Sequence, residues 1–232
     1  MTFDEHVVLV TGSSRGLGEA FARCIAAGGA TVVVNSTGQS DRGEAVARGI
    51  RDEGGKAVHI AGRVEDSAAL VESVVAECGA IDGIVHNAGI LGQRLSIEQQ
   101  DITEWFQVMH VNVTVPFVLT QALFPLLRKS EDPSIIFTSS GVGRRGIAFW
   151  GAYSVSKFAT EGLSEILADE HRQGNLRSNC VNPGATRTKM RLAAYPAEDR
   201  DKLKRPEDIL ASYIFLLGPD SKGVTGESLD AQ

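Results

Sequence analysis

The chain has 232 residues, of which 43% are hydrophobic and 22% charged, a balance typical of a globular protein with one sizeable core. We therefore expect one domain over residues 1–232. The formal net charge is −6, and the 23 Lys and Arg residues are scattered along the chain, which argues against a nucleic acid as partner.

The N-terminal stretch MTFDEHVVLVTGSS has acidic residues before a short apolar run that breaks at Gly12. This pattern matches neither a secretory signal nor a membrane span, so we expect a cytoplasmic protein with no membrane partner. Cys24, Cys78 and Cys180 lie far apart, which fits neither a disulfide framework nor a zinc site. We expect three reduced thiols and no metal.

Short β-branched runs then alternate with longer helical stretches. The runs predict buried strands over 7–10, 31–34, 56–60, 83–86, 134–138 and 178–182. The stretches predict helices over 16–27, 102–128 and 150–171, and the apolar face of Leu70, Val71, Val74, Val75 and Cys78 predicts another. This alternation is typical of βαβ units, so we expect an α/β fold with a parallel sheet covered on both faces.

A glycine-rich turn, TGSSRGLG over 11–18, joins the first predicted strand to the first helix. Glycines at 12, 16 and 18 would allow a tight turn, a close approach of a pyrophosphate to the backbone, and close packing of helix on strand. An ordinary strand-to-helix loop is the alternative. The position directly after a buried strand and before a helix favours a dinucleotide cofactor.

The stretch GAYSVSKFATEG, residues 151–162, places Tyr153 and Lys157 on one face of a predicted helix. Such a pair also occurs by chance on many helix surfaces. Its meaning depends on the other motifs of the chain.

Six motifs occur in a characteristic order: TGSSRGLG, HNAG at 86–89, Asn112 within HVNVT, FTSS at 137–140, YSVSK at 153–157 and NPGATRT at 182–188. Together they resemble the successive motifs of the short-chain dehydrogenase/reductase family over nearly the whole chain. The run TSSGVGRRGIAFWGAYSVSKFATEG, followed by LADE and NPGATRTKMR, most resembles the bacterial YciK-like oxidoreductases. The resemblance implies a Rossmann-like three-layer fold with a parallel seven-stranded sheet in the order 3-2-1-4-5-6-7. It also implies the reversible reduction of a ketone or aldehyde to an alcohol with NAD(P)(H).

The resemblance assigns four catalytic positions. Tyr153 would exchange a proton with the substrate oxygen, and Lys157 would hold the nicotinamide ribose and lower the pKa of the phenol. Ser140, thirteen residues before Tyr153, would hydrogen-bond the substrate oxygen, with Ser139 as the competing candidate. Asn112 would hold a water that relays protons, although it could also be an ordinary polar position.

The resemblance also implies a set of cofactor-contacting residues: Gly12, Ser14, Arg15, Gly16, Leu17, Gly18, Ser36, Thr37, Val64, Asn87, Ala88, Gly89, Tyr153, Lys157, Pro183, Gly184, Thr186 and Thr188. Asn87 is expected to tie strands to the adenosine side of the pocket. Two positions depart from the family pattern. His86 stands where many members have Asn and is expected to be structural, whereas Arg63 replaces an Asp that usually faces the adenine, which leaves Val64 as the remaining contact.

The end of the second predicted strand bears on the form of the cofactor. An acidic residue there would bind the ribose hydroxyls of NAD and repel a 2′-phosphate, but the chain has Asn35, Ser36 and Thr37. Arg15 lies where members that prefer NADP commonly carry a basic residue, and a guanidinium suits phosphate. We therefore expect NADP(H) rather than NAD(H), with an exposed loop arginine as the alternative interpretation.

The resemblance implies a small carbonyl compound or alcohol as substrate. The region expected to close over it, Lys189 to Arg205, has only 17 residues, which predicts an open pocket. An apolar lining, or an ordinary aromatic core, could come from Phe149, Trp150, Met190 and Tyr195. Arg144 and Arg145 could meet an anionic group, but a solvated pair on a loop is the favoured interpretation.

Members of the family usually form tetramers through the helices that carry Asn112 and Tyr153. Apolar residues on these helices could supply such surfaces: Val113, Val115, Phe117, Val118, Phe158, Leu163 and Ile166. We expect a homotetramer, with a dimer as the next possibility. Two other functions remain open: a regulator that binds the cofactor without turnover, and an isomerase or epimerase with transient hydride transfer.

Overall fold

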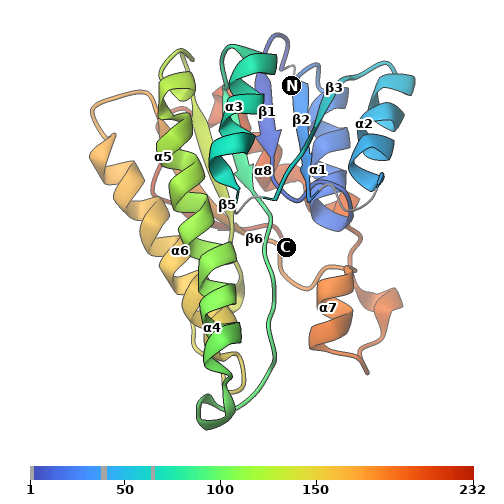
Figure 1. Ribbon diagram of the computed structural model, residues 1–232, viewed down its shortest axis with the longest axis vertical. Helices are drawn as coiled ribbons and strands as arrows, with labels where there is room; N and C mark the ends of the chain where they lie inside the picture. Colours follow the sequence, from blue (N-terminus) through green and yellow to red (C-terminus); the bar gives the residue numbers. More distant parts are fainter. Residues whose placement is uncertain (1–2, 38–40, 64–65) are drawn as a thin grey trace.

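The computed structural model describes residues 3–37, 41–63 and 66–232 (Figure 1). Val64 lies outside these ranges. The described chain contains seven strands: β1 Val7–Val10, β2 Thr31–Ser36, β3 Lys56–Ala61, β4 Gly83–His86, β5 Ser134–Thr138, β6 Arg177–Asn182 and β7 Ser228–Asp230. They form one sheet in the order β3-β2-β1-β4-β5-β6-β7, and every neighbouring pair is parallel. The expected strand order is confirmed.

Helices connect the strands. The α-helices are α1 Gly16–Ala27, α2 Arg42–Asp52, α3 Ser67–Cys78, α4 Ile102–Met109, α5 Val115–Leu127, α6 Gly151–Glu170, α7 Lys189–Ala194 and α8 Ala211–Leu217. Shorter turns are η1 Ile97–Gln99, η2 His110–Thr114, η3 Gly141–Gly143, η4 Arg200–Lys202, η5 Pro206–Ile209 and η6 Pro219–Ser221. The element η2 is a π-helical turn between α4 and α5, so the helix predicted over 102–128 is present with an interruption.

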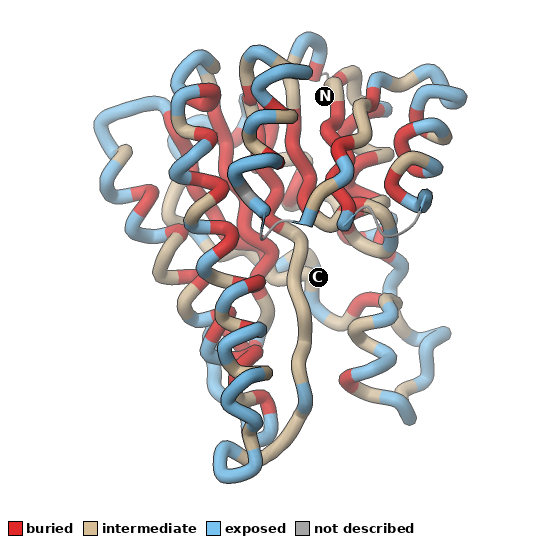
Figure 2. Tube along the Cα trace, viewed as in Figure 1, coloured by how far each residue is buried: buried red, intermediate tan, exposed pale blue. Residues whose placement is uncertain are grey.

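The sheet is buried on both faces (Figure 2), as parallel sheets require. Strand side chains alternate between the faces: Val8 and Val10 of β1 belong to one core, and Leu9 belongs to the other. Residues of α1, α2 and α8 cover the first face, and residues of α3, α5 and α6 cover the second. This three-layer arrangement matches the predicted fold class.

The stretch from Ile102 to Leu127 is long and apolar enough to cross a membrane by length and composition alone. Half of its most apolar window is buried within the fold, and Leu119 and Leu123 pack into the second core. These contacts are those of a core helix. Val115 is also buried in this core, so its expected place on an intersubunit surface is wrong.

The parallel sheet places the predicted motifs at one edge. The glycine-rich loop follows β1, Thr37 follows β2, Asn87 follows β4, Ser140 follows β5 and the NPGATRT segment begins at the end of β6. All of these lie at the carboxyl ends of their strands, where open α/β sheets bind ligands. In Figure 1 the loop after β4 runs down beside α4, and α7 stands across from it.

Candidate active site

Tyr153 and Lys157 lie one turn apart on α6, and both are buried, with exposed fractions of 9% and 6%. Lys157 Nζ lies 5.6 Å from the centre of the Tyr153 ring. It donates a hydrogen bond of 2.6 Å to the main-chain oxygen of Thr138, the last residue of β5. The predicted shared face is therefore anchored directly on the carboxyl edge of the sheet.

The structure separates the two candidate serines. Ser139 is buried, and its hydroxyl donates a hydrogen bond to the Glu161 carboxylate. Ser140 is half-buried, and a side-chain hydrogen bond joins it to Tyr153. The geometry thus favours Ser140 as the partner of the phenol.

Burial controls the protonation of both side chains on α6. It raises the pKa of Tyr153 to about 12, and the hydrogen bond with Ser140 opposes this shift. Burial also lowers the pKa of Lys157 to about 8, against the opposing influence of Cys180 and Glu161. The expectation that Lys157 would bring the phenol pKa towards neutrality is wrong for this arrangement, because desolvation dominates. Tyr153 therefore remains protonated at neutral pH.

Asn112 lies in the π turn η2, with an exposed fraction of 2%. Its side-chain amide pairs with the main chain of Ile90, accepting from the nitrogen and donating to the oxygen, both at 2.9 Å. The same amide nitrogen donates to Ser156 on α6 at 3.0 Å. Asn112 therefore connects the segment after β4 to the helix that carries Tyr153.

The main-chain oxygen of Asn112 lacks the hydrogen bond that residue i+4 donates in a regular α-helix. Pro116, four residues later, has no amide hydrogen to donate to it. The hydroxyl of Thr160 on α6 contacts this oxygen at 3.4 Å. Residues of π turns often occur at functional sites, and this carbonyl could accept a hydrogen bond from a water.

The glycine-rich loop packs tightly against the segment after β4. Gly12 has a φ of +65°, and a Cβ there would lie 2.9 Å from Ala88 Cα. A Cβ at Gly18 would lie 2.6 Å from Asn87 Nδ2. That amide donates to the main-chain oxygens of Thr11 at 3.0 Å and Gly12 at 3.3 Å. Asn87 thus joins β4 to the loop, as expected, and Leu17 packs against the first core.

A cationic hollow of about 370 Å³ opens beside this loop; its lining residues are Ser14, Arg15, Glu19, Arg23, Arg42, Ala45, Val46 and Lys189. Glu19 is paired with Arg23 at 3.2 Å. Among the described residues, no ion pair involves Arg15, Arg42 or Lys189, and all three are exposed. Arg15 was predictable from its place in the glycine-rich loop, whereas no sequence pattern groups Arg42 and Lys189 with it.

The end of β2 carries no carboxylate at residues 35–37. Ser36 is buried, and its hydroxyl lies 2.9 Å from Nε2 of His59 on β3, whereas Thr37 is exposed. Of the two predicted contacts, Thr37 is therefore the more accessible. Arg63 is exposed.

The NPGATRT segment returns towards the glycine-rich loop. A Cβ at Gly16 would lie 3.9 Å from Thr188, whose hydroxyl caps α7 by accepting from Arg191 N at 3.1 Å. Thr186 donates to the main-chain oxygen of Pro183 at 3.0 Å, and Gly184 has a φ of +67°. The predicted residues of this segment thus lie beside those that follow β1.

Two other expectations concern polar residues near the site. His86 lies 2.9 Å from Thr120 Oγ1 and stacks on Phe137, and burial lowers its pKa to about 3, which agrees with a structural role. Arg144 and Arg145 are both exposed, which agrees with their interpretation as a solvated loop pair, and Arg144 also forms an ion pair with Asp230 at 2.8 Å and donates to Ser228.

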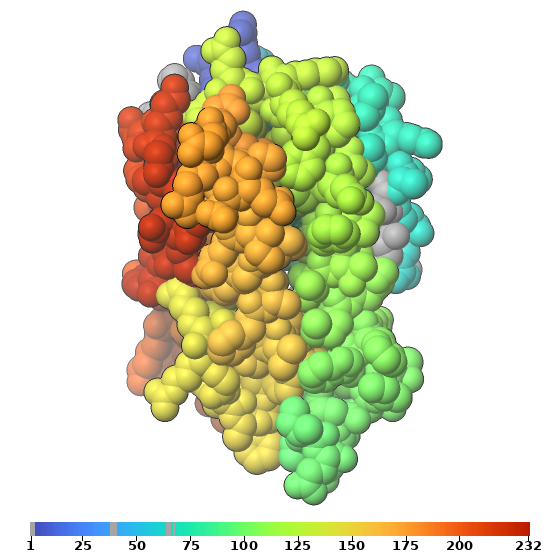
Figure 3. All heavy atoms as spheres, turned by 90° about the vertical axis from the view of Figure 1, so that its left-hand side faces the viewer, coloured from blue at the N-terminus to red at the C-terminus, as the bar shows by residue number. Residues whose placement is uncertain are grey.

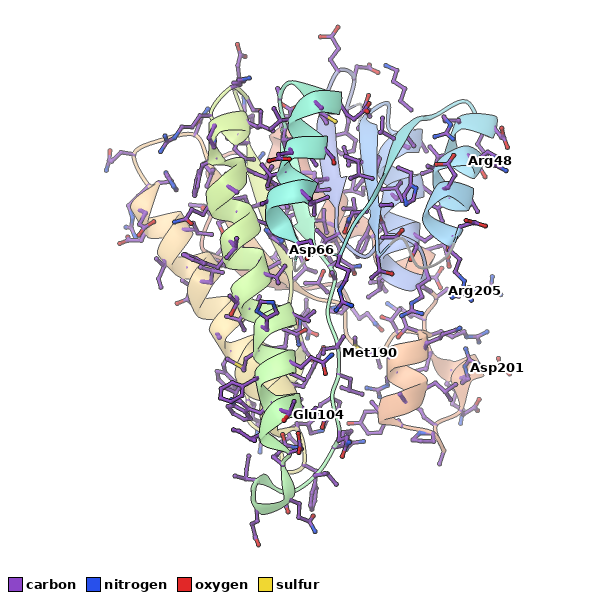
Figure 4. The ribbon with its side chains drawn as sticks, in the orientation of Figure 1. Arg48, Asp66, Glu104, Met190, Asp201 and Arg205 are labelled. Atoms are coloured by element: carbon purple, nitrogen blue, oxygen red, sulfur yellow. The ribbon has the colours of Figure 1, made fainter. Side chains whose placement is uncertain are left out.

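Aromatic and aliphatic side chains pack around Tyr153. Trp150, Val142 and Ala194 form a buried cluster with Tyr153, and Leu91, Met190 and Tyr195 pack against it. Met190 lies on the side of α7 that faces the loop after β4 (Figure 4). Three of the four expected lining residues therefore gather here, whereas Phe149 is 57% exposed and lies outside the cluster.

Comparison with known proteins agrees with this geometry. A family model described as short chain dehydrogenase matches residues 6–199. The chain belongs to the short-chain dehydrogenase/reductase family. It is therefore an oxidoreductase enzyme of that family.

Individual relatives are similar over nearly the whole length. The uncharacterized oxidoreductase YciK of Escherichia coli K12 is 44% identical over 99% of this chain and 92% of its own. A short chain dehydrogenase from Shigella flexneri, crystallised with NADP, is 44% identical with a TM-score of 0.92, covering 99% of this chain and 98% of its own. One from Escherichia coli CFT073, crystallised with NADPH, is 45% identical with a TM-score of 0.92, covering 99% and 97%. The resemblance to YciK-like oxidoreductases is confirmed.

Proposed function

We propose that this enzyme uses NADPH to reduce a ketone or aldehyde to an alcohol, reversibly, with Ser140, Tyr153 and Lys157 as catalytic residues and Asn112 as a water-holding residue. The observation that carries the proposal is the position of Tyr153, which is buried beside Ser140 and lies one turn from Lys157 on α6. A protonated phenol is a proton donor, as carbonyl reduction requires.

The chain fits a dinucleotide phosphate. Gly12 and Gly18 occupy positions where a Cβ would collide with neighbouring backbone or side chain, and the loop leads directly into the N-terminus of α1, where free amides suit a phosphate. The hollow beside it is lined by Arg15, Arg42 and Lys189, and none of these has an anionic partner among the residues that the structure describes. This unpaired positive charge suits a 2′-phosphate and supports NADP(H) over NAD(H), as do the two neighbours crystallised with NADP and NADPH.

The remaining cofactor contacts are proposed from the motifs. They are Ser14, Gly16, Leu17, Ser36, Thr37, Asn87, Ala88, Gly89, Pro183, Gly184, Thr186 and Thr188, together with Val64, which lies outside the described residues. Within this set, Asn87 and Leu17 would also hold the loop in place, given their packing inside the protein.

The catalytic residues would divide the work as follows. NADPH supplies a hydride to the carbonyl carbon when it is bound. Ser140 would donate a hydrogen bond to the carbonyl oxygen, and Tyr153 would give its proton to that oxygen as negative charge develops. Lys157 would hold the ribose hydroxyls, and its ammonium, 5.6 Å from the centre of the Tyr153 ring, would keep the ribose close to the proton donor. A water at the Asn112 carbonyl would return a proton to the site.

The direct test is a panel of ketones and aldehydes assayed separately with NADPH and NADH. We expect net oxidation of NADPH and a higher kcat/KM than with NADH. An isomerase or epimerase would convert substrate without net loss of NADPH, and a regulator would bind NADPH without turnover of any carbonyl. A preference for NADH would contradict the assignment of the cationic hollow.

We also propose that the chain forms a homotetramer, with a dimer as the alternative, through α5 and α6. These helices lie side by side on one face (Figure 3). Phe117 on α5 and Phe158 and Ile166 on α6 are exposed by 47%, 44% and 56%. Sedimentation at micromolar concentration should show an assembly larger than a monomer, and Phe158→Glu should dissociate it because a buried charge would oppose contact.

The remaining expectations are one domain over 1–232, a small carbonyl or alcohol substrate, and a cytoplasmic location without membrane or nucleic acid as partner. The single seven-stranded sheet and the apolar cluster at Tyr153 support the first two. A single cooperative unfolding transition would support one domain, whereas two separate transitions would contradict it.

A further inference from the structure

Arg94 occupies an unusual position on the loop after β4. Its guanidinium carbon lies 4.5 Å from the centre of the Trp150 ring and 4.7 Å from that of Tyr195. Its Nη1 donates a hydrogen bond to the main-chain oxygen of Ala194. One arginine therefore contacts the loop before α6 and the end of α7, while belonging to a third segment.

The charge of Arg94 has no anionic partner among the residues that the structure describes. Arg191 provides a contrast within the same cluster, because it lies 4.0 Å from the same Tyr195 ring. Arg191 is held by Glu198 through two hydrogen bonds of 2.6 Å. Aromatic faces attract a cation but do not neutralise it. Arg94 is thus a half-buried positive charge that no described carboxylate neutralises.

The hydrogen-bonding pattern of Arg94 indicates which ligand group would fit. Nη1 is used by Ala194, whereas Nε is buried and has no hydrogen-bond partner within the described chain. Leaving a buried donor unpaired is costly, so such a group calls for a partner. Nε and the adjacent Nη2 form one edge of the guanidinium with two parallel donors, and this fork matches the two oxygens of a carboxylate.

The site of this edge relative to Tyr153 makes it relevant to the substrate. Trp150, which stacks on Arg94, lies 5.8 Å from Tyr153 between ring centres and belongs to the same buried cluster. Only one aromatic ring therefore separates the guanidinium from the proposed proton donor. We propose that Arg94 binds a carboxylate on the substrate, so that the enzyme prefers carbonyl compounds that carry a carboxylate. This inference rests on the proposed carbonyl reduction.

A purely structural role is the competing explanation, since Arg94 also ties the loop after β4 to α7. The two roles predict different responses to substrate charge. If Arg94 only ties this loop to α7, its loss should lower kcat/KM for all substrates alike, because it acts through the shape of the pocket. A carboxylate-binding residue would discriminate between an acid and its ester, because only the acid offers the fork an anion.

The test compares kcat/KM for para-carboxybenzaldehyde and for its methyl ester, with NADPH as the reductant. We expect the wild type to prefer the acid by about 10- to 100-fold, the range that a charged hydrogen bond supports. Arg94→Met should abolish this ratio, and Arg94→Lys should retain part of it, since it keeps a charge without the fork. Arg191→Met is the matched control: it removes a cation from the same Tyr195 ring, and the ratio should persist.

The outcomes separate this inference from the proposed function. Equal kcat/KM for acid and ester in the wild type, or an equal loss for both in Arg94→Met, would overturn the role of Arg94 while leaving carbonyl reduction intact. If neither aldehyde is reduced, the proposed function fails, and calorimetric titration with para-toluate then tests the site by itself. Binding that weakens at least about tenfold in Arg94→Met supports the site, and equal or absent binding overturns it.

Discussion

The two ends of the candidate site differ in how they treat charge. Tyr153 and Lys157 are both buried. Burial favours the neutral form of each group, so it raises the pKa of Tyr153 and lowers the pKa of Lys157. Beside the glycine-rich loop, Arg15, Arg42 and Lys189 are exposed. Proton transfer needs a group whose protonation the surroundings control, whereas recognition of a phosphate needs charges that remain positive. The two ends should therefore respond differently to mutation, pH and salt.

The largest effect is expected from Tyr153→Phe, which deletes the proton donor at the buried end and keeps the ring. Turnover of a carbonyl should fall by about 10²–10⁴-fold, the usual contribution of a general acid, while the Kd for NADPH barely changes. Steady-state kinetics and a fluorescence titration with NADPH measure the two quantities.

Tyr213→Phe is the matched control for this variant. Tyr213 is also fully buried, and its hydroxyl lies 3.4 Å from Thr138 Oγ1, behind the site on α8. Burial raises its pKa as well, yet we assign it no proton transfer. If Tyr213→Phe slowed turnover as much as Tyr153→Phe, loss of a buried hydroxyl rather than loss of the acid would explain both.

Lys157→Ala should differ from Tyr153→Phe, because Lys157 is proposed to take part both in proton transfer and in binding the cofactor. Removing the ammonium loses the proposed ribose contact, so the Kd for NADPH should rise by about tenfold or more, in addition to a slower turnover. Unchanged NADPH affinity in this variant would argue against the ribose contact.

The pH dependence of NADPH binding gives a second view of the same residue. The pKa of Lys157 is lowered to about 8, so the ammonium is present below pH 8 and is lost as the pH rises through it. Wild-type affinity for NADPH should therefore weaken between pH 7 and 9, by at most about tenfold per pH unit. Lys157→Ala should lack this change over the same range. An identical pH profile in both proteins would show that another group titrates.

The fold was largely predictable because most of its strands are largely buried. Six β-branched runs identified six strands, and parallel sheets produce such runs since both faces are covered. The seventh strand, Ser228–Asp230, has only three residues, none of them fully buried, so its composition carries little signal. The family resemblance, rather than periodicity, supplied it.

The site was predictable in its motifs and less so in its electrostatics. Sequence spacing could not separate Ser139 from Ser140, because the choice depends on Glu161, which binds the first of them from α6. The high pKa of Tyr153 was missed because desolvation depends on packing. Arg42 was missed since it lies 27 residues after Arg15, and only the fold brings both to one hollow.

At the exposed end, Arg42→Ala should lower kcat/KM with NADPH by about tenfold and leave kcat/KM with NADH nearly unchanged, because only NADPH carries the 2′-phosphate. Arg48→Ala is the matched control: it removes the same charge from the same helix, from a position outside the hollow (Figure 4). Equal effects of the two variants would reduce the role of Arg42 to a contribution to net charge.

The smallest effect, and the one that bears most directly on the contrast between the ends, is the response to salt. Raising the ionic strength from about 0.05 to 0.3 M shortens the Debye length, so the exposed cations attract a phosphate less strongly. We expect the KM for NADPH to rise a few-fold over this range and kcat to stay constant, because the groups around Tyr153 are buried and poorly screened. Arg42→Ala should reduce this salt dependence, since one of the three screened charges is gone. A fall in kcat with salt, at saturating NADPH and carbonyl, would mean that the catalytic end also depends on exposed charge and would remove the distinction between the two ends.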